Sequence, residues 1–218
     1  MAKKVAVILS GCGVFDGAEI YEATLVQLRL DEAGVEFQCM APNVSQMHVL
    51  NHMTGEEMPE TRNVLVESAR LCRGNIIDLA EARAEDYDAV IVPGGFGVAK
   101  NLSSFAVDGT GMSVNEDLVN FIQAMNQQGK PVGLVCIAPA LAPKLFGEGV
   151  KCTLGSDEDD AAKAVVAMGA SHESCAVDEI SIDETRKLVT TPAYMLAGRI
   201  SEASAGISKL VEAVLARA

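Results

Sequence analysis

Short apolar runs that stop at glycine-rich or proline-containing turns restrict the fold of this chain more than any other feature. Residues 4–9 form one such run, and it stops at Ser-Gly-Cys-Gly. Residues 87–93 and 129–136 repeat the pattern and stop at Pro-Gly-Gly and at Cys136. A continuous apolar run of this length is typical of a strand that is buried on both faces of a sheet. We therefore expect these three strands in the middle of a sheet.

Segments with helical periodicity separate the strands. Ile20, Leu25 and Leu28 recur at intervals typical of a helix, and Gly34 follows as a helix stop. Strands and helices that alternate from end to end predict an α/β fold with a doubly wound, mostly parallel sheet flanked by helices. The remaining predicted elements are strands at 35–40, 150–154 and 187–191, a hairpin at 174–183, and helices at 60–72, 114–128, from Cys136 to about 146, at 157–168 and up to 216.

The chain of 218 residues contains no internal repeat and no linker long enough to divide it. We expect a single domain spanning residues 1–218. The least regular part, at about 42–74, is interpreted as an insertion or lid.

Charge and apolar run lengths restrict the partners and the location. Thirty acidic and seventeen basic residues give a formal charge of −13, which repels a phosphate backbone, so no nucleic acid partner is expected. The first apolar run is too short for a signal peptide, and no run reaches the length of a membrane span. Six cysteines without a C-x-x-C pair indicate free thiols in a reducing compartment. We expect a soluble cytoplasmic protein that forms a homodimer, since most soluble oligomers are twofold.

Four strand ends converge on one edge of such a sheet, at residues 10–17, 93–97, 136–139 and 190–194, and this edge is where α/β sheets bind ligands. Cys136 lies there, at a strand-to-helix turn. The following helix N-terminus is expected to lower its thiol pKa, and backbone N–H groups after the turn can form an oxyanion hole. A buried structural cysteine is the alternative, and local context alone favours neither.

Two glutamates occupy the first turns of the helix that faces the same edge. Glu19 or Glu22 can stand beside the sulfur as an acid or base. The alternative is that both lie on a solvated face and stabilise the helix N-terminus.

Other motifs are weaker evidence for a functional site. His48 and His52 are spaced like two metal ligands on a helix, but Asn51 and Gly55 argue against a helix there, so no metal site is expected. The glycines at 94–97 lack the full dinucleotide fingerprint, and no cofactor is expected. Cys12 lies near the site and is interpreted as a thiol that tunes it or oxidises.

Four segments resemble a known family in the same order along the whole chain: SGCGVFDGAEIYEA, AVIVPGGFGVAKNL, GKPVGLVCIAPALAPKL and KLVTTPAYMLA. They closely resemble the glyoxalase-like proteins of the ElbB (enhancing lycopene biosynthesis) type. These belong to the class I glutamine amidotransferase-like superfamily, together with the PfpI-like and deglycase branches. The resemblance implies a flavodoxin-like sandwich with Cys136 on a nucleophile elbow.

The resemblance also implies roles for individual residues. Glu22 matches the assisting glutamate, with Glu19 as the second choice. The binding residues it implies are Gly94 and Gly95 in the P-G-G loop, the amide of Ile137 as the other oxyanion donor, Thr190 and Thr191 on the opposite wall, and Asn101 at its border.

Two departures narrow the implied activity. The His-x-Glu pair of amidotransferases is missing after the nucleophile, and Ile137 occupies the position of the histidine in the Cys-His dyad of peptidases and deglycases. The remaining Cys–Glu pair is similar to that of glyoxalases that use no cofactor. It implies conversion of a small dicarbonyl, glyoxal or methylglyoxal, to a 2-hydroxy acid through a cysteine thiohemiacetal. A thiol-based stress sensor, or an amidase or deglycase of the same superfamily, are the alternatives.

Overall fold

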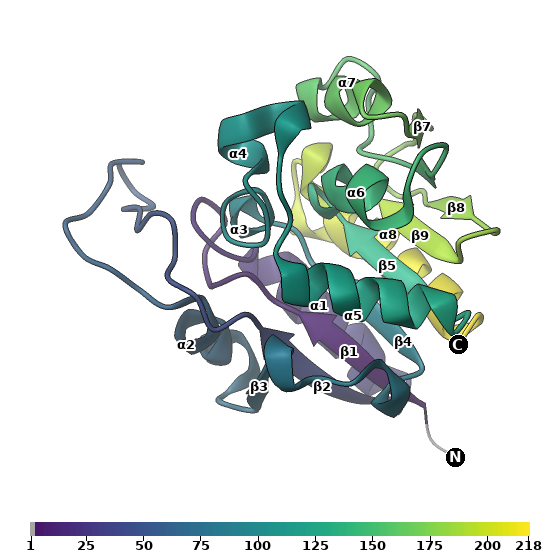
Figure 1. Cartoon of the computed structure of the whole chain (residues 1–218), viewed down its shortest axis with the longest axis horizontal. Helices are drawn as coiled ribbons and strands as arrows, with labels where there is room; N and C mark the ends of the chain where they lie inside the picture. The colour runs from purple at the N-terminus through teal and green to yellow at the C-terminus, as the bar shows by residue number, and fades with distance from the viewer. Residues whose placement is uncertain (1–2) are drawn as a thin grey trace.

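The computed structural model describes residues 3–218 and shows a seven-stranded sheet between layers of helices (Figure 1). The strand order is β3-β2-β1-β4-β5-β9-β8, and neighbouring strands run parallel except β8, which is antiparallel to β9. The predicted α/β fold with a doubly wound, mostly parallel sheet is therefore confirmed. The strands of this sheet are β1 Lys4–Ile8, β2 Glu36–Ala41, β3 Ile76–Asp78, β4 Ala89–Val92, β5 Val132–Val135, β8 Ser181–Asp183 and β9 Leu188–Thr191.

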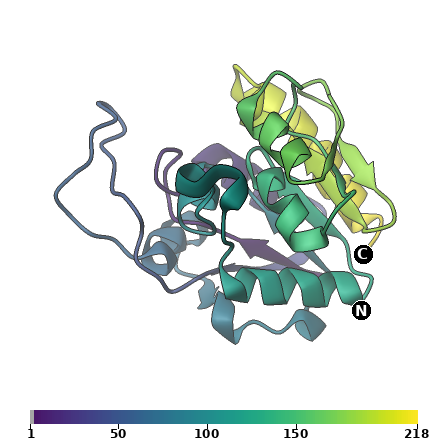
Figure 2. The ribbon, with the colours of Figure 1, turned by 45° about the horizontal axis from the view of Figure 1, so that its top comes forward.

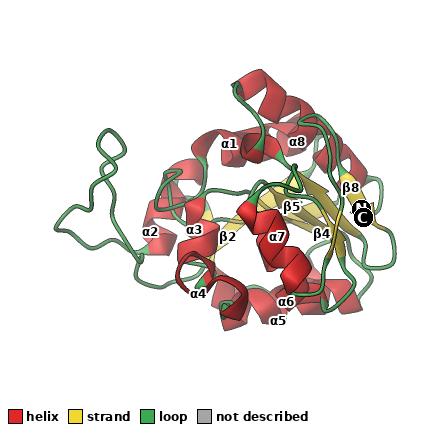
Figure 3. Ribbon diagram, turned by 90° about the horizontal axis from the view of Figure 1, so that it is seen from above, coloured by secondary structure: helices red, strands yellow, loops and turns green. Residues whose placement is uncertain are grey.

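Helices cover both faces of the sheet. Helices α1 and α8 pack together on one face, while α5 and α6 cover the other, as the view from above shows (Figure 3). The helices are α1 Ile20–Glu32, α2 Val64–Ser68, α3 Phe96–Lys100, α4 Phe105–Asp108, α5 Glu116–Gln127, α6 Ala142–Phe146, α7 Asp160–Ala167 and α8 Ile200–Leu215. Within residues 3–218, no helix combines the length and apolar character needed to cross a bilayer.

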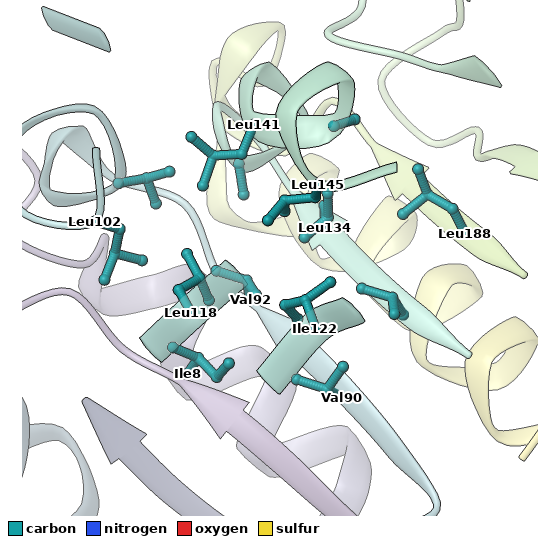
Figure 4. Close-up of a cluster of buried hydrophobic side chains, with 14 of the residues drawn as sticks. Ile8, Val90, Val92, Leu102, Leu118, Ile122, Leu134, Leu141, Leu145 and Leu188 are labelled. Carbon is teal, nitrogen blue, oxygen red and sulfur yellow. The ribbon is translucent and has the colours of Figure 1, made fainter. Parts of the chain in front are cut away.

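Aliphatic side chains fill the space between the layers. All residues of β4 and β5 are buried, as their apolar runs predict. On the α5 face, Leu134 packs in one cluster with Leu118 and Ile122 (Figure 4). On the other face, Ile91 belongs to a cluster with Leu210. The sheet is thus a rigid base for the loops at its carboxyl edge.

Helix α1 forms where predicted but presents a different face to the sheet. Ile20 and Leu28, whose spacing predicts the helix, are exposed. The buried residues are Glu22, Ala23, Val26 and Leu30. The inward face of α1 therefore includes a carboxylate, which apolar periodicity does not detect.

The region after β5 differs from its predicted elements. Two-residue strands β6 Lys151–Cys152 and β7 Ser171–His172 form a separate small sheet. The N–H of Thr153 donates to the hydroxyl of Thr190 at 2.9 Å, so the predicted strand at 150–154 ends early. The hairpin joins β8 to β9 and does not lie at 174–183. Helix α7 is shorter than the predicted segment 157–168.

Two predicted helices are also shorter than expected. The segment predicted as helix 60–72 contains α2 and a 3₁₀ turn, Ala69–Cys72. After Cys136 a 3₁₀ turn, Ala138–Leu141, precedes α6. Pro139 lies in this 3₁₀ turn and Pro143 lies in α6. Neither proline has a backbone N–H to continue a helical ladder, so a single long helix does not form after Cys136.

Residues 42–63, the projecting segment, extend away from the sheet and return through α2 (Figures 1 and 2). Isolated bridges join Ser45 to Asn63 and Leu50 to Glu57 within it. The segment is joined to the loop after β1 by the carboxylate of Asp16, which accepts the N–H of Leu50 at 2.7 Å. The projecting segment covers the first part of the predicted insertion at about 42–74. The rest of that range contains α2 and the 3₁₀ turn that follows it.

Candidate functional site

Cys136 follows β5 directly, at the sheet edge where β1, β4 and β9 also end. Its backbone φ is +61°, a left-handed conformation that is uncommon and strained for a residue with a side chain. Its N–H donates to the carbonyl of Thr191 at 2.9 Å, which continues the ladder between β5 and β9. The residue is 7% exposed. The sheet therefore holds the thiol in a sharp turn, as expected for a nucleophile elbow.

Glu22 is fully buried and lies beside this thiol. It reaches the site from the inward face of α1, and its carboxyl group is hydrogen-bonded to the Cys136 sulfur. Its Oε2 accepts the N–H of Gly94 at 2.9 Å, and its Oε1 accepts the N–H of Tyr194 at 3.2 Å. Three segments thus fix the orientation of one carboxyl group against one sulfur.

Burial raises the pKa of Glu22 to about 8, and the neighbouring charge of Glu19 adds to the shift. Hydrogen bonds from Tyr194, Cys136 and Gly94 oppose it. A carboxyl group with this pKa exchanges its proton near neutral pH, where an acid–base catalyst is most effective.

The predicted lowering of the Cys136 thiol pKa is wrong. Burial raises this pKa well above its usual value, and the charge of Glu22 raises it further. The N–H groups of Gly95 and Ile137 donate to the sulfur and lower the pKa, but less than burial raises it. A short 3₁₀ turn follows the cysteine instead of a regular helix, so no full helix dipole offsets the burial.

Gly94 and Gly95 leave no room for a side chain. A Cβ on Gly94 would lie 2.5 Å from the Cβ of Cys136 and 2.6 Å from Oε2 of Glu22. A Cβ on Gly95 would lie 2.3 Å from the backbone nitrogen of Glu19, and Gly95 has a φ of +99°. The two glycines therefore allow the loop after β4 to pack directly on the thiol and on α1.

We expect Gly94→Ala to destabilise the fold by about 2 kcal/mol, because the added methyl overlaps both members of the Cys136–Glu22 pair. Denaturant unfolding measures this change. Gly111→Ala is the matched control, since a Cβ at Gly111 would have no atom within 4 Å and the residue has no positive φ. Equal unfolding midpoints for the two variants would contradict the close packing at Gly94.

Glu19 lies near the pair but performs a different task. It is the N-cap of α1, and its Oε2 accepts the N–H of Glu22 at 2.7 Å. Burial raises its own pKa. Of the two glutamates, the structure therefore brings Glu22 to the sulfur and leaves Glu19 to cap the helix and to act on the charge of Glu22.

The two threonines predicted to line the site have hydrogen-bond partners away from the thiol. Thr190 and Thr191 are fully buried in β9. The Thr190 hydroxyl accepts the N–H of Thr153, and the Thr191 hydroxyl donates to the carbonyl of Glu179 at 2.8 Å. They do not form an open wall, because the β6 region and the segment before β8 cover them.

Asn101 joins loops instead of facing the thiol. Its Nδ2 donates to the carbonyls of Ser10 and Asp16, both at 2.9 Å, and its Oδ1 accepts the N–H of Met47 at 3.0 Å. Every polar atom of the amide is used in these contacts. Asn101 therefore ties the loop after β1 to the base of the projecting segment.

His52, in the projecting segment, serves local structure. The ring of His52 stacks on Phe15 at 4.8 Å, and its Nε2 accepts the N–H of Phe15 at 3.2 Å. Among residues 3–218, no group of three His, Cys, Asp or Glu side chains is arranged to hold a metal ion. Cys12 is half-buried in the loop after β1, and burial together with the charge of Glu67 raises its pKa.

Tyr194 is a site residue to which the sequence assigns no role. Its N–H holds Glu22, and its ring forms a tilted pair with that of Tyr21 at 6.4 Å. Burial raises the pKa of its phenol, and the charges of Glu19, Tyr21 and Glu22 raise it further. Its place within the fourth strand end, residues 190–194, is the signal that identifies it.

The arrangement permits one kind of chemistry. A carboxyl group lies beside a thiol, and the N–H groups of Gly95 and Ile137 are directed at the sulfur. In such an arrangement the thiol can add to an electrophilic carbon, the N–H groups can stabilise a negative charge, and the carboxyl group can move a proton. Because Cys136 is only 7% exposed, only small molecules can reach its sulfur.

Comparisons with known proteins agree with the fold. The model of the DJ-1/PfpI family matches residues 3–190. A human mitochondrial protein, glutamine amidotransferase-like class 1 domain-containing protein 3, is 46% identical over 98% of this chain and 83% of its own length. The rat mitochondrial ES1 protein homolog is 45% identical over 97% of this chain and 83% of its own length.

Solved structures show the same architecture. An isoprenoid biosynthesis protein with an amidotransferase-like domain from Ehrlichia chaffeensis superposes with a TM-score of 0.92, at 36% identity and 99% coverage of both chains. Glyoxalase III from Candida albicans has a TM-score of 0.63 at 18% identity, covering 99% of this chain and 97% of its own, which shows a shared fold.

The expectation of a cytoplasmic protein is contradicted by these relatives. The human and rat proteins, and the Danio rerio ES1 protein at 36% identity, are all named as mitochondrial. Apolar run lengths and cysteine spacing do not distinguish one reducing compartment from another.

Proposed function

The chain belongs to the DJ-1/PfpI family, and on this basis we propose that it is a glyoxalase-like enzyme of the ElbB type that uses no cofactor. It converts glyoxal or methylglyoxal to a 2-hydroxy acid. The observation that carries the proposal is the buried contact between the Cys136 sulfur and the Glu22 carboxyl group, with the N–H groups of Gly95 and Ile137 at the sulfur. The 36% identity to the Ehrlichia chaffeensis protein supports the ElbB type.

The reaction begins when Glu22 takes the thiol proton and the sulfur adds to one aldehyde carbon, giving a thiohemiacetal. The amides of Gly95 and Ile137 stabilise the alkoxide oxygen. Glu22 returns the thiol proton to this alkoxide and is again a carboxylate. It then removes the hydrogen on the same carbon, giving an enediolate, and delivers that proton to the neighbouring carbon. The hydroxyl proton of the adduct moves to the neighbouring oxygen, and the adduct becomes a thioester. Water hydrolyses the thioester and releases the 2-hydroxy acid and the thiol. The sum is the addition of one water, without net oxidation.

The raised pKa of Cys136 favours this proposal over a thiol-based stress sensor. A sensor requires a thiolate that is present and accessible at neutral pH. Burial opposes both conditions here, whereas Glu22 can generate the thiolate when a carbonyl is in place.

The geometry also favours it over an amidase that uses a Cys-His pair. His172 is the one histidine after the nucleophile in the sequence. Its Nε2 accepts the N–H of Leu154 at 2.9 Å, and its Nδ1 contacts Asp157 at 2.7 Å. Both ring nitrogens are therefore engaged in holding the β6–β7 region.

The proposal predicts glycolate as the product from glyoxal and lactate from methylglyoxal, with no glutathione and with a chelator present. Proton NMR in D₂O measures the product and its deuterium content. Proton transfer through Glu22 allows exchange with solvent, so we expect deuterium on the carbon that bears the hydroxyl group.

Unfolded protein at the same concentration is the control, because it retains every lysine, arginine and cysteine that can form adducts with dicarbonyls. Loss of glyoxal at equal rates in both samples, without glycolate, would refute the proposed activity.

A further inference from the structure

Cys39 and Cys72 are two thiols in contact outside the Cys136 site. Cys39 lies in β2 and is 1% exposed, whereas Cys72 ends the 3₁₀ turn after α2 and is half-buried. Cys72 packs against the same buried cluster to which Cys39 belongs, and each thiol shifts the pKa of the other. The Cys72 sulfur also contacts the carbonyl of Ser68 at 3.6 Å.

The backbone holds the two thiols together. The carbonyl of Cys72 accepts the N–H of Asn75 at 3.0 Å in a tight turn. Strand β3 begins at the next residue, Ile76, which pairs with Cys39 on the adjacent strand β2. The chain therefore returns from Cys72 directly to the neighbour of Cys39, and α2 lies close to both strands (Figure 1).

We propose that Cys39 and Cys72 are a redox-active dithiol, which a low-molecular-weight disulfide such as glutathione disulfide oxidises to an intramolecular disulfide. Cys72 is the attacking thiol and Cys39 the resolving thiol. Neither residue belongs to the Cys136 site, so the proposal is independent of the glyoxalase activity.

Exposure and hydrogen bonding assign these roles. Cys72 is reachable from solvent, and the hydrogen bond from Cys39 lowers its thiol pKa. The same contact and burial raise the pKa of Cys39, which keeps it as a thiol until Cys72 has reacted. A reagent that cannot enter the core therefore meets Cys72 first.

The step balances in atoms and electrons. The Cys72 thiolate attacks glutathione disulfide and forms a mixed disulfide, releasing one glutathione thiolate. Cys39 then loses its proton to this thiolate and attacks the Cys72 sulfur, which displaces the second glutathione. Two protein thiols are oxidised, and one disulfide of glutathione is reduced to two thiols.

The new bond would fasten the return of the projecting segment to the sheet. Ser68, at the end of α2, accepts the N–H of Gly11 through its hydroxyl at 2.9 Å. The turn that carries Cys72 is thus joined to the loop after β1, whose other end leads into α1. Oxidation would restrict this turn and stabilise the fold.

The test uses the full chain with Cys136→Ala, so that the site thiol does not react, and incubates it with glutathione disulfide. Peptide mapping without reduction should find residues 39 and 72 linked, with the loss of two free thiols by titration. The melting temperature should rise by roughly 5 °C and return when a reductant is added.

Matched variants assign the reaction. Adding Cys39→Ser should leave Cys72 as a mixed disulfide with glutathione, and adding Cys72→Ser should leave Cys39 unmodified. Adding Cys175→Ser, which removes a half-buried thiol elsewhere, should not change the linked peptide. A Cys72 that stays as the mixed disulfide while Cys39 is present, or oxidation of other cysteines with no linkage of 39 to 72, would overturn the proposal.

Discussion

Cys136→Ala is expected to lower glyoxal turnover by about 10³-fold or more, because the sulfur forms the bond on which every later step depends. The fold should survive the change. Cys136 already has a Cβ at a φ of +61°, so alanine adds no backbone strain there. Alanine also adds no atom to the packing around Gly94. Glycolate formation followed by NMR measures the loss, and thermal unfolding verifies that the variant is folded.

Cys175→Ala is the control for this prediction. It removes a half-buried thiol that lies after β7 and away from Glu22. Its rate should equal that of the unmodified chain. A rate for Cys136→Ala within threefold of the control would show that glyoxal is consumed at other nucleophiles.

The sequence predicts the central strands and the sharp turn at Cys136 because both depend on local composition. Residues 132–135 are apolar at every position, which only a strand covered on both faces requires, and such a strand places Cys136 at the ligand-binding edge. The glycines at 94 and 95 mark the close approach of a second loop. These signals need no knowledge of distant contacts.

Other features depend on contacts that no local pattern encodes. Periodicity predicts α1 but not its inward face, because that face contains Glu22 in place of an apolar residue. The thiol pKa has the opposite shift from the prediction, since burial by segments far apart in the chain outweighs the nearby N–H groups. Thr190 and Thr191 lie in the predicted strand but are covered by residues from the β6 region and from before β8.

Glu22→Gln is expected to lower kcat/KM for glyoxal by about 10³-fold at pH 8, the range for loss of a general acid–base group. Glu22 and Cys136 titrate as a pair, and the form that has lost one proton is the active one. Since the pKa of Glu22 is about 8, the rate of the unmodified chain should rise with pH to a plateau above that value. It should fall tenfold per pH unit below it.

The variant should lack this rise near pH 8. Without the carboxylate, the first proton to leave is that of the buried thiol, whose pKa burial still raises above its usual value, so any remaining activity should increase only at higher pH. The amide of glutamine keeps one oxygen to accept the N–H of Gly94 or Tyr194, and circular dichroism verifies that the fold is retained.

Glu19→Gln separates the charge effect from simple disruption of the helix. Its amide oxygen can still cap α1 at the N–H of Glu22, but its negative charge is lost. Because that charge raises the pKa of Glu22, the midpoint of the rate profile should move to lower pH while the plateau is retained. A plateau reduced at every pH with an unchanged midpoint would mean that Glu19 supports the helix and does not act on Glu22. An unchanged midpoint in Glu22→Gln would remove Glu22 from the reaction altogether.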